Sequence, residues 1–124
     1  MEHVELMTKI FEIFPEVRFI GMYTSKFEKI IDGYQKDIIP HLSREEYQNS
    51  VRYDIRRWET YRMFQKQLGD AKYSMVKYDK ATLLTFPLVN EEFLRISIEP
   101  HADYKIIIEK ILDLITKNPI LQSK

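Results

Sequence analysis

The chain has 124 residues, of which 44% are hydrophobic and 31% are charged. This balance is typical of a single folded domain and excludes an intrinsically disordered chain. The 19 basic and 19 acidic residues cancel, which argues against nucleic acid as a partner, and the lack of cysteine excludes disulfides and thiolate sites.

No apolar run approaches the roughly 18 residues needed to span a bilayer. The first residues also lack the basic region and cleavable apolar stretch of a signal peptide. We therefore expect a cytoplasmic protein with no membrane partner. We expect one domain over residues 1–118, because no linker divides the chain, and a flexible tail over residues 119–124.

The first third of the chain predicts a helix and two strands. Apolar residues recur at helical spacing over residues 4–14, and Pro15 ends that pattern. Residues 17–24 are rich in aromatic and β-branched types, and apolar side chains occur at both odd and even positions. This pattern predicts a strand covered on both faces. Residues 28–33 are expected to return as the second strand, before an irregular crossover.

The middle of the chain predicts one long amphipathic helix over residues 43–69. Ser43 and Glu46 have the spacing of a capping box, and Gly69 suits the position just past a helix end. Neither proline nor glycine interrupts the segment between them. One side of this helix is apolar, and its members follow steps of three and four residues: Tyr47, Val51, Ile55, Trp58, Tyr61 and Leu68.

Tyr53 and Phe64 fall on a flank next to this apolar side, so the apolar sector is wider than the roughly 100° that covers one core. A sector that wide predicts one contact inside the domain and a second outside it. We assign the outer contact, a dimer or partner interface, to Tyr53, Arg57, Thr60 and Phe64. The inner set can be core or can line a pocket between helix and sheet: Tyr47, Val51, Ile55, Trp58 and Tyr61.

Three strands and a helix are expected in the last third. The strands cover residues 71–79, 82–89 and 93–99, with a turn at Asn90. The third strand alternates, with Leu94, Ile96 and Ile98 on one side, as expected for a strand with one buried face. An apolar seam over residues 103–117 predicts the final helix.

The order of elements is therefore α-β-β-α-β-β-β-α, which predicts an α+β domain with a five-stranded antiparallel sheet and a long central helix. This arrangement resembles the roadblock, longin and profilin-like domains, and it matches the roadblock order best. Four segments also resemble a family of small archaeal proteins of unknown function: VRFIGMYTSKFEKIIDGY, LSREEYQNSVRYDIRRWETYR, LGDAKYSMVKYDKATLLTFPL and ADYKIIIEKILDLI.

The roadblock resemblance implies a homodimer formed through the central helix and a neighbouring strand. It also implies a platform for small GTPases or other protein partners. The chain departs from a typical roadblock domain in its aromatic, basic central helix and its long last helix.

The sequence shows no candidate catalytic, metal or cofactor site. His3, His41 and His101 are scattered without the spacing of metal ligands. The three glycines are isolated and form no phosphate-binding loop. A basic group that includes Arg52, Arg56 and Lys66 is either a solvated face or a contact surface for an acidic partner.

These observations favour a non-enzymatic, homodimeric interaction or regulatory module without a cofactor. The competing hypothesis is a small-molecule sensor domain that binds an apolar ligand between the central helix and the sheet. That alternative requires a cavity of ~300 Å³ or more beneath the helix.

Overall fold

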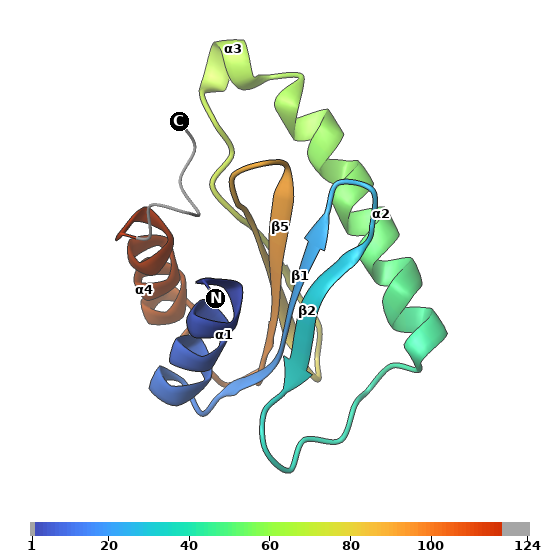
Figure 1. Cartoon of the computed structure of the whole chain (residues 1–124), viewed down its shortest axis with the longest axis vertical. Coiled ribbons are helices and arrows are strands. Elements are labelled where there is room, and N and C mark those ends of the chain that lie inside the picture. The colour runs from blue at the N-terminus through green and yellow to red at the C-terminus, as the bar shows by residue number, and fades with distance from the viewer. Residues whose placement is uncertain (1, 118–124) are drawn as a thin grey trace.

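A computed structural model describes residues 2–117, so the expected tail at 119–124 lies outside the described residues. The elements within that range follow the expected order, with one short additional helix, α3 (Figure 1). They are α1 (Glu2–Ile13), β1 (Val17–Thr24), β2 (Lys29–Tyr34), α2 (Arg44–Arg62), α3 (Gln65–Leu68), β3 (Ser74–Lys77), β4 (Thr82–Pro87), β5 (Glu92–Ile98) and α4 (Tyr104–Lys117). None of the described helices is long and apolar enough to cross a membrane.

The strands form a single sheet in the order β2-β1-β5-β4-β3, and every pairing in the described chain is antiparallel. Ile20 of β1 lies opposite Gly33 of β2 on one side and Ile96 of β5 on the other. This arrangement confirms the predicted five-stranded antiparallel sheet and the α+β class. It leaves β2 and β3 as the two edges of the sheet.

Helices α1 and α4 cover one face of the sheet (Figure 1). Leu6 and Ile10 of α1 and Ile107 and Ile111 of α4 are buried there against side chains of β1, β4 and β5. Each fully buried aliphatic side chain of this kind contributes ~1.5–3 kcal/mol to folding, so this layer supplies most of the hydrophobic stabilisation.

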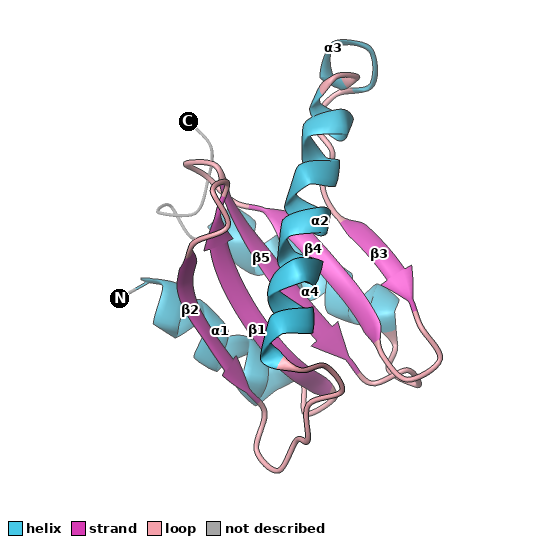
Figure 2. Cartoon of the chain, turned by 90° about the vertical axis from the view of Figure 1, so that its right-hand side faces the viewer, coloured by secondary structure: helices cyan, strands magenta, loops and turns pink. Residues whose placement is uncertain are grey.

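Helix α2 crosses the opposite face (Figure 2). Val51, Ile55 and Trp58 pack there against Tyr23 of β1 and Phe93 of β5. The same packing buries both faces of β1, as predicted. The expectation that β5 has one buried face is wrong. Phe93 and Arg95, on its second face, are only 2% and 4% exposed, because α2 covers them.

The predicted single helix over residues 43–69 is also wrong at its C-terminal end. The capping box of Ser43 and Glu46 forms as expected, but α2 ends at Arg62, and Met63 and Phe64 separate it from α3. Every residue from 62 to 73 is exposed, Leu68 by 82%, so Leu68 does not belong to the buried stripe. Helices of this size depend on packing. Because no described element covers this part of the chain, nothing favours a continuous helix beyond Arg62.

Candidate binding groove

A groove of about 850 Å³ lies beside α2, over the part of the sheet that this helix leaves uncovered. Leu83 of β4 and Val76 of β3 contribute to its floor, and Tyr53 and Arg57 of α2 line its wall. The loop of residues 78–81 lines another part of its boundary. A cavity of ~300–1,000 Å³ is the size that small-molecule sites have, so this groove meets the volume expected of a ligand site.

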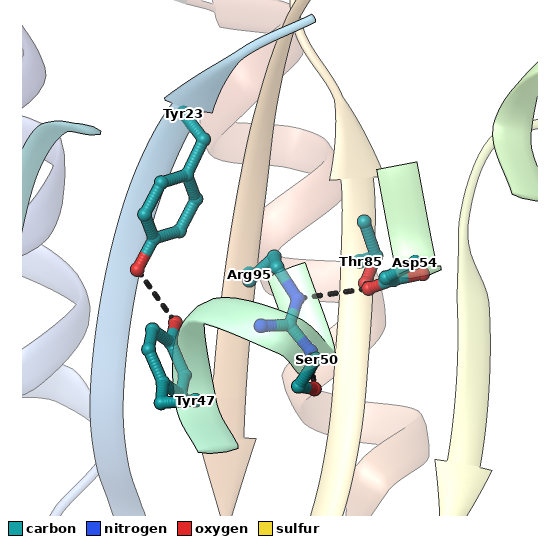
Figure 3. Close-up of polar contacts among 6 residues, drawn as sticks. All are labelled: Tyr23, Tyr47, Ser50, Asp54, Thr85 and Arg95. Carbon is teal, nitrogen blue, oxygen red and sulfur yellow. Dashed lines mark hydrogen bonds and ion pairs between the residues drawn. The ribbon is translucent and has the colours of Figure 1, made fainter. Parts of the chain in front are cut away.

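The groove contains a buried polar network that joins α2 to the sheet (Figure 3). Arg95 of β5 donates from Nε to Asp54 Oδ2 at 2.8 Å and from Nη2 to Ser50 Oγ at 2.9 Å. The Thr85 hydroxyl of β4 donates to the same Asp54 oxygen. Two strands therefore meet the helix through one carboxylate, which fixes the position of α2 above the sheet.

Arg95 keeps one buried donor without a partner. Its Nη1 atom makes no hydrogen bond among the described residues, and its guanidinium lies 5.3 Å from the centre of the Tyr47 ring. A hollow of about 10 Å³ adjoins Arg95, and Phe19, Tyr47 and Ser97 line both this hollow and the larger groove. A space of this size holds about one water molecule or one ligand oxygen.

Tyr47 also connects the groove to the core. Its hydroxyl accepts a 2.7 Å hydrogen bond from the Tyr23 hydroxyl of β1. Burial raises the pKa of Tyr47 to about 12, with the Arg95 charge acting in the opposite direction. Burial likewise raises the pKa of Tyr23, and the neighbouring Tyr47 adds to that rise. Both phenols therefore stay protonated through the neutral range, where Tyr23 donates to Tyr47 and the Tyr47 hydroxyl keeps its own proton.

Arg18 holds the crossover segment against the sheet beside the groove. Its Nη1 donates to both carboxylate oxygens of Glu99, at 3.1 and 3.2 Å, and its Nη2 donates to the backbone oxygen of Ile39 at 2.9 Å. Pro40 and Leu42, just beyond Ile39, line the groove. The ion pair thereby positions one boundary of the cavity.

The structure separates the two sets of residues assigned from the sequence. Val51, Ile55 and Trp58 are buried under α2, with Tyr61 packed against Trp58 and partly buried. Tyr47 contacts this core and also lines the groove. The set assigned to an outer interface is exposed, and its members are Tyr53, Arg57, Thr60 and Phe64. Tyr53 and Arg57 line the groove as well.

Edge strand β3 carries a second group of exposed apolar side chains. Met75 and Val76 are each 38% exposed and Tyr78, just after the strand, is 57% exposed. Strand β3 pairs only with β4 among the described elements, so its other side presents unpaired backbone groups. The edge therefore combines backbone hydrogen-bonding capacity with exposed apolar surface.

The basic residues of α2 and α3 that the sequence groups together are exposed to solvent. Arg52, Arg56 and Lys66 are exposed and form no ion pair with any residue between positions 2 and 117. Arg56 lies 5.7 Å from the centre of the Phe27 ring. Asp54 lies close to these cations in the sequence, but its side chain is turned inward to Arg95. The exposed surface of α2 is therefore more basic than its composition indicates.

Asp54 and Arg95 are the groove residues that sequence reasoning misses. A signal for both was present. Asp54 lies three residues after Val51 and four before Trp58, inside the buried stripe of α2, and Arg95 lies between buried Leu94 and Ile96. Two opposite charges inside apolar patterns on different elements suggest a buried pair, because neither charge is stable in a core alone.

No group of three or more His, Cys, Asp or Glu side chains suited to hold a metal ion occurs within residues 2–117. The three histidines lie in different places. His3 is 2.8 Å from Glu92 through Nε2, His41 lines the groove, and His101 is exposed.

No protein-family model and no curated protein matches the sequence. Several solved structures do match the fold. A roadblock/LC7 domain from Streptomyces avermitilis has a TM-score of 0.68 at 12% identity, over 90% of this chain and 89% of that chain. The gliding protein MglB from Thermus thermophilus has a TM-score of 0.71 at 9% identity, over 91% and 84%. An MglB structure with a tetrameric arrangement has a TM-score of 0.66 at 11% identity, over 90% and 85%.

At these identities the likeness shows the fold alone. It confirms the roadblock-like topology expected from the order of elements. The resemblance to a small archaeal family stays a prediction, because no family model matches the sequence.

Proposed function

We propose that this protein is a non-enzymatic regulatory module that works as a homodimer and holds a protein partner, such as a small GTPase, in the cytoplasm. The observation that carries the proposal is the exposed edge strand β3 beside the exposed aromatic flank of α2. The roadblock-like fold supports it, and one MglB structure of that fold is a tetrameric arrangement.

Pairing between two β3 edges would satisfy the backbone groups that this strand leaves open. An exposed edge with apolar side chains favours addition of another strand. A second copy offers an identical strand, and the two-fold symmetry of a homodimer lets one surface meet itself. Met75 and Val76 would then be covered from the partner's side.

The flank of α2 has the composition of an interface. Tyr53 is 66% exposed and Phe64 is 52% exposed, and Arg57 lies between them in sequence without an ion pair among the described residues. Aromatic residues and arginine are the types enriched where proteins meet. Thr60 adds an exposed residue near the same flank.

Sedimentation equilibrium tests the dimer. The wild type should show twice the 15.0 kDa mass of one chain. Phe64→Asp and Tyr53→Asp should shift the protein towards single chains and leave its melting temperature nearly unchanged, because both side chains are exposed. Ile106→Asp on α4 is the matched control, since Ile106 is 57% exposed, and it should remain dimeric. A wild type of one chain's mass would refute the proposal.

The basic face of α2 is the surface that we assign to the partner. Pull-down from the native cell with the wild type and with an Arg52→Glu/Arg56→Glu variant tests this assignment. A protein retained by the wild type and lost by the variant is the expected result. Equal capture by both would show that these arginines do not contact the partner.

The groove favours a second candidate function, a small-molecule sensor. Its volume of about 850 Å³ exceeds the ~300 Å³ that such a site needs. A thermal-shift screen against a metabolite panel tests this candidate, and a ligand should raise the melting temperature. The absence of any shift across the panel would argue against a sensor and would leave the dimer proposal untouched.

A further inference from the structure

We propose that the groove beside α2 binds a small organic acid, with its carboxylate hydrogen-bonded to Arg95 and its aromatic or apolar body against the tyrosines of the groove. This inference rests on the second candidate function and specifies its ligand. It depends on three features of the described residues: an unused donor, a small excess of basic over acidic side chains in the lining, and aromatic side chains in the wall.

The unpaired Nη1 donor of Arg95 favours a ligand with a hydrogen-bond acceptor. Arg95 is 4% exposed, and its Nε and Nη2 are engaged by Asp54 and Ser50, but Nη1 has no partner among the described residues. A buried donor without a partner is costly, so an acceptor oxygen placed beside it is favoured. The hollow of about 10 Å³ next to Arg95 has room for one such atom, and it shares Phe19 and Ser97 with the groove.

The charges around the groove favour an anion over a neutral acceptor. The lining has four basic side chains, Arg18, Arg57, Lys80 and Arg95, and three carboxylates, Glu46, Asp54 and Asp79. Lys80 forms no ion pair in the part of the chain that the structure describes, so its charge is available to a ligand. An incoming carboxylate therefore meets a lining with one more positive than negative charge.

The aromatic and aliphatic side chains that line the groove favour a ligand with an aromatic or apolar body. Tyr34, Tyr47, Tyr53 and Tyr78 line the groove, and Leu83 contributes an aliphatic surface to its floor. Flat aromatic or apolar bodies gain the most from contact with such rings, while the tyrosine hydroxyls can serve polar substituents. Apolar and aromatic side chains combined with a few fixed polar groups are typical of small-molecule sites.

Isothermal titration with matched pairs of probes tests the inference. The acids are benzoate, phenylacetate and indole-3-acetate, and each is compared with its primary amide, which has the same shape and no charge. We expect at least one acid to bind about tenfold more tightly than its amide, as a charge-assisted hydrogen bond is stronger than a neutral one. Circular dichroism confirms that each variant used below is folded.

Two variants locate the site. Arg95→Lys keeps the charge but cannot present the same donors, so it should remove the preference for the acid. Leu83→Trp fills the floor without touching the polar network and should abolish binding. Ile106→Trp, an exposed position on α4 outside the groove, is the matched control and should bind like the wild type.

The outcomes separate the inference from the function on which it rests. Equal affinity for acids and amides, or an unchanged acid preference in Arg95→Lys, would overturn the organic-acid inference and leave a sensor function standing. Unchanged binding in Leu83→Trp would place the ligand elsewhere and would also overturn it. Failure of every probe to bind would overturn the inference, whereas the sensor function would fall only with the wider metabolite panel.

Discussion

Asp54 of α2 and Arg95 of β5 form a buried ion pair between the helix and the sheet. Asp54 Oδ2 lies 2.8 Å from Arg95 Nε, and the side chains of Arg95 and Asp54 are 5% and 12% exposed. Ser50 and Thr85 extend the pair into a network that spans α2, β5 and β4. This network of polar contacts fixes the position of α2 over the sheet.

Removal of one charge from this pair should be far more damaging than removal of both. Asp54→Ala leaves Arg95 buried without its counter-charge and should lower the free energy of unfolding by ~3–5 kcal/mol. An Asp54→Leu/Arg95→Met double variant removes both charges and should lie within ~1–2 kcal/mol of the wild type. Urea denaturation measures both. A double variant as unstable as the single one would show that the packing, and not the charge, is responsible.

The strands and the start of α2 could be predicted because local rules decide them. The Ser43–Glu46 capping box forms as its spacing predicts, with Ser43 N donating to Glu46 at 2.8 Å. The end of α2 could not be predicted, since Met63 and Phe64 are compatible with a helix. The helix ends because the sheet no longer lies beneath it, and this depends on tertiary structure.

The groove escapes sequence reasoning for a related reason. Alternation along β5 indicates which side chains share a face but does not show that α2 covers the second face of that strand. Arg95 therefore looks solvent-facing from the sequence, although it is 4% exposed. The placement of α2 over β1 and β5, which leaves β3 and the Leu83 end of β4 less covered, follows from Trp58 and Ile55 packing on Tyr23 and Phe93.

Gly21 and Gly33 lie in adjacent strands and should respond differently to alanine. A Cβ atom at Gly21 would lie 2.7 Å from Cε2 of the Tyr23 ring, which is 4% exposed and has little room to move. A Cβ atom at Gly33 would meet Met7 at an ordinary 3.7 Å. Gly21→Ala should therefore cost ~1–3 kcal/mol through overpacking, and Gly33→Ala should cost less than ~0.5 kcal/mol or stabilise.

Thermal and urea unfolding of both glycine variants measures this difference. Near-ultraviolet circular dichroism should also change in Gly21→Ala, because Tyr23 must move away from Tyr47. If the two variants are equally stable, the Tyr23 ring is not held as tightly as its burial indicates.

The buried phenols should make the fold less stable in alkali. Burial raises the pKa of Tyr47 to about 12 from the ordinary 10.0, so the folded chain keeps a proton that the unfolded chain loses. The stability that this retained proton gives the fold is fully present below pH 10 and declines as the pH rises towards about 12. The free energy of unfolding should fall across that interval.

Urea denaturation at a series of alkaline pH values checks the direction. Tyr47→Phe removes one titrating phenol and should make the decline shallower, and Tyr23→Phe/Tyr47→Phe should make it shallower still. The comparison between variants separates these two groups from the other residues that titrate in alkali. An identical pH dependence in all three proteins would contradict the assignment.

The turn between β4 and β5 should become more stable when Glu91 is replaced by glycine. Asn90 and Glu91 both have positive φ, at 58° and 56°. A two-residue hairpin turn of this kind favours asparagine followed by glycine, because glycine has no Cβ to clash in the left-handed region. Glu91→Gly should relieve ~1 kcal/mol of backbone strain. The greater entropy of the unfolded chain offsets part of that gain, so we expect a net gain of ~0.5 kcal/mol.

Loss of the glutamate side chain also removes its ion pair with Arg62, at 3.4 Å. The Arg62 and Glu91 side chains are 46% and 68% exposed, so the pair contributes only ~0–0.5 kcal/mol. Arg62→Ala removes the pair together with the contact of Arg62 over the Phe93 ring, at 5.9 Å, so its effect is an upper limit for the pair. The expected result is a higher urea midpoint for Glu91→Gly than for the wild type. A midpoint lower than that of Arg62→Ala would show that the positive φ of Glu91 carries no strain worth relieving.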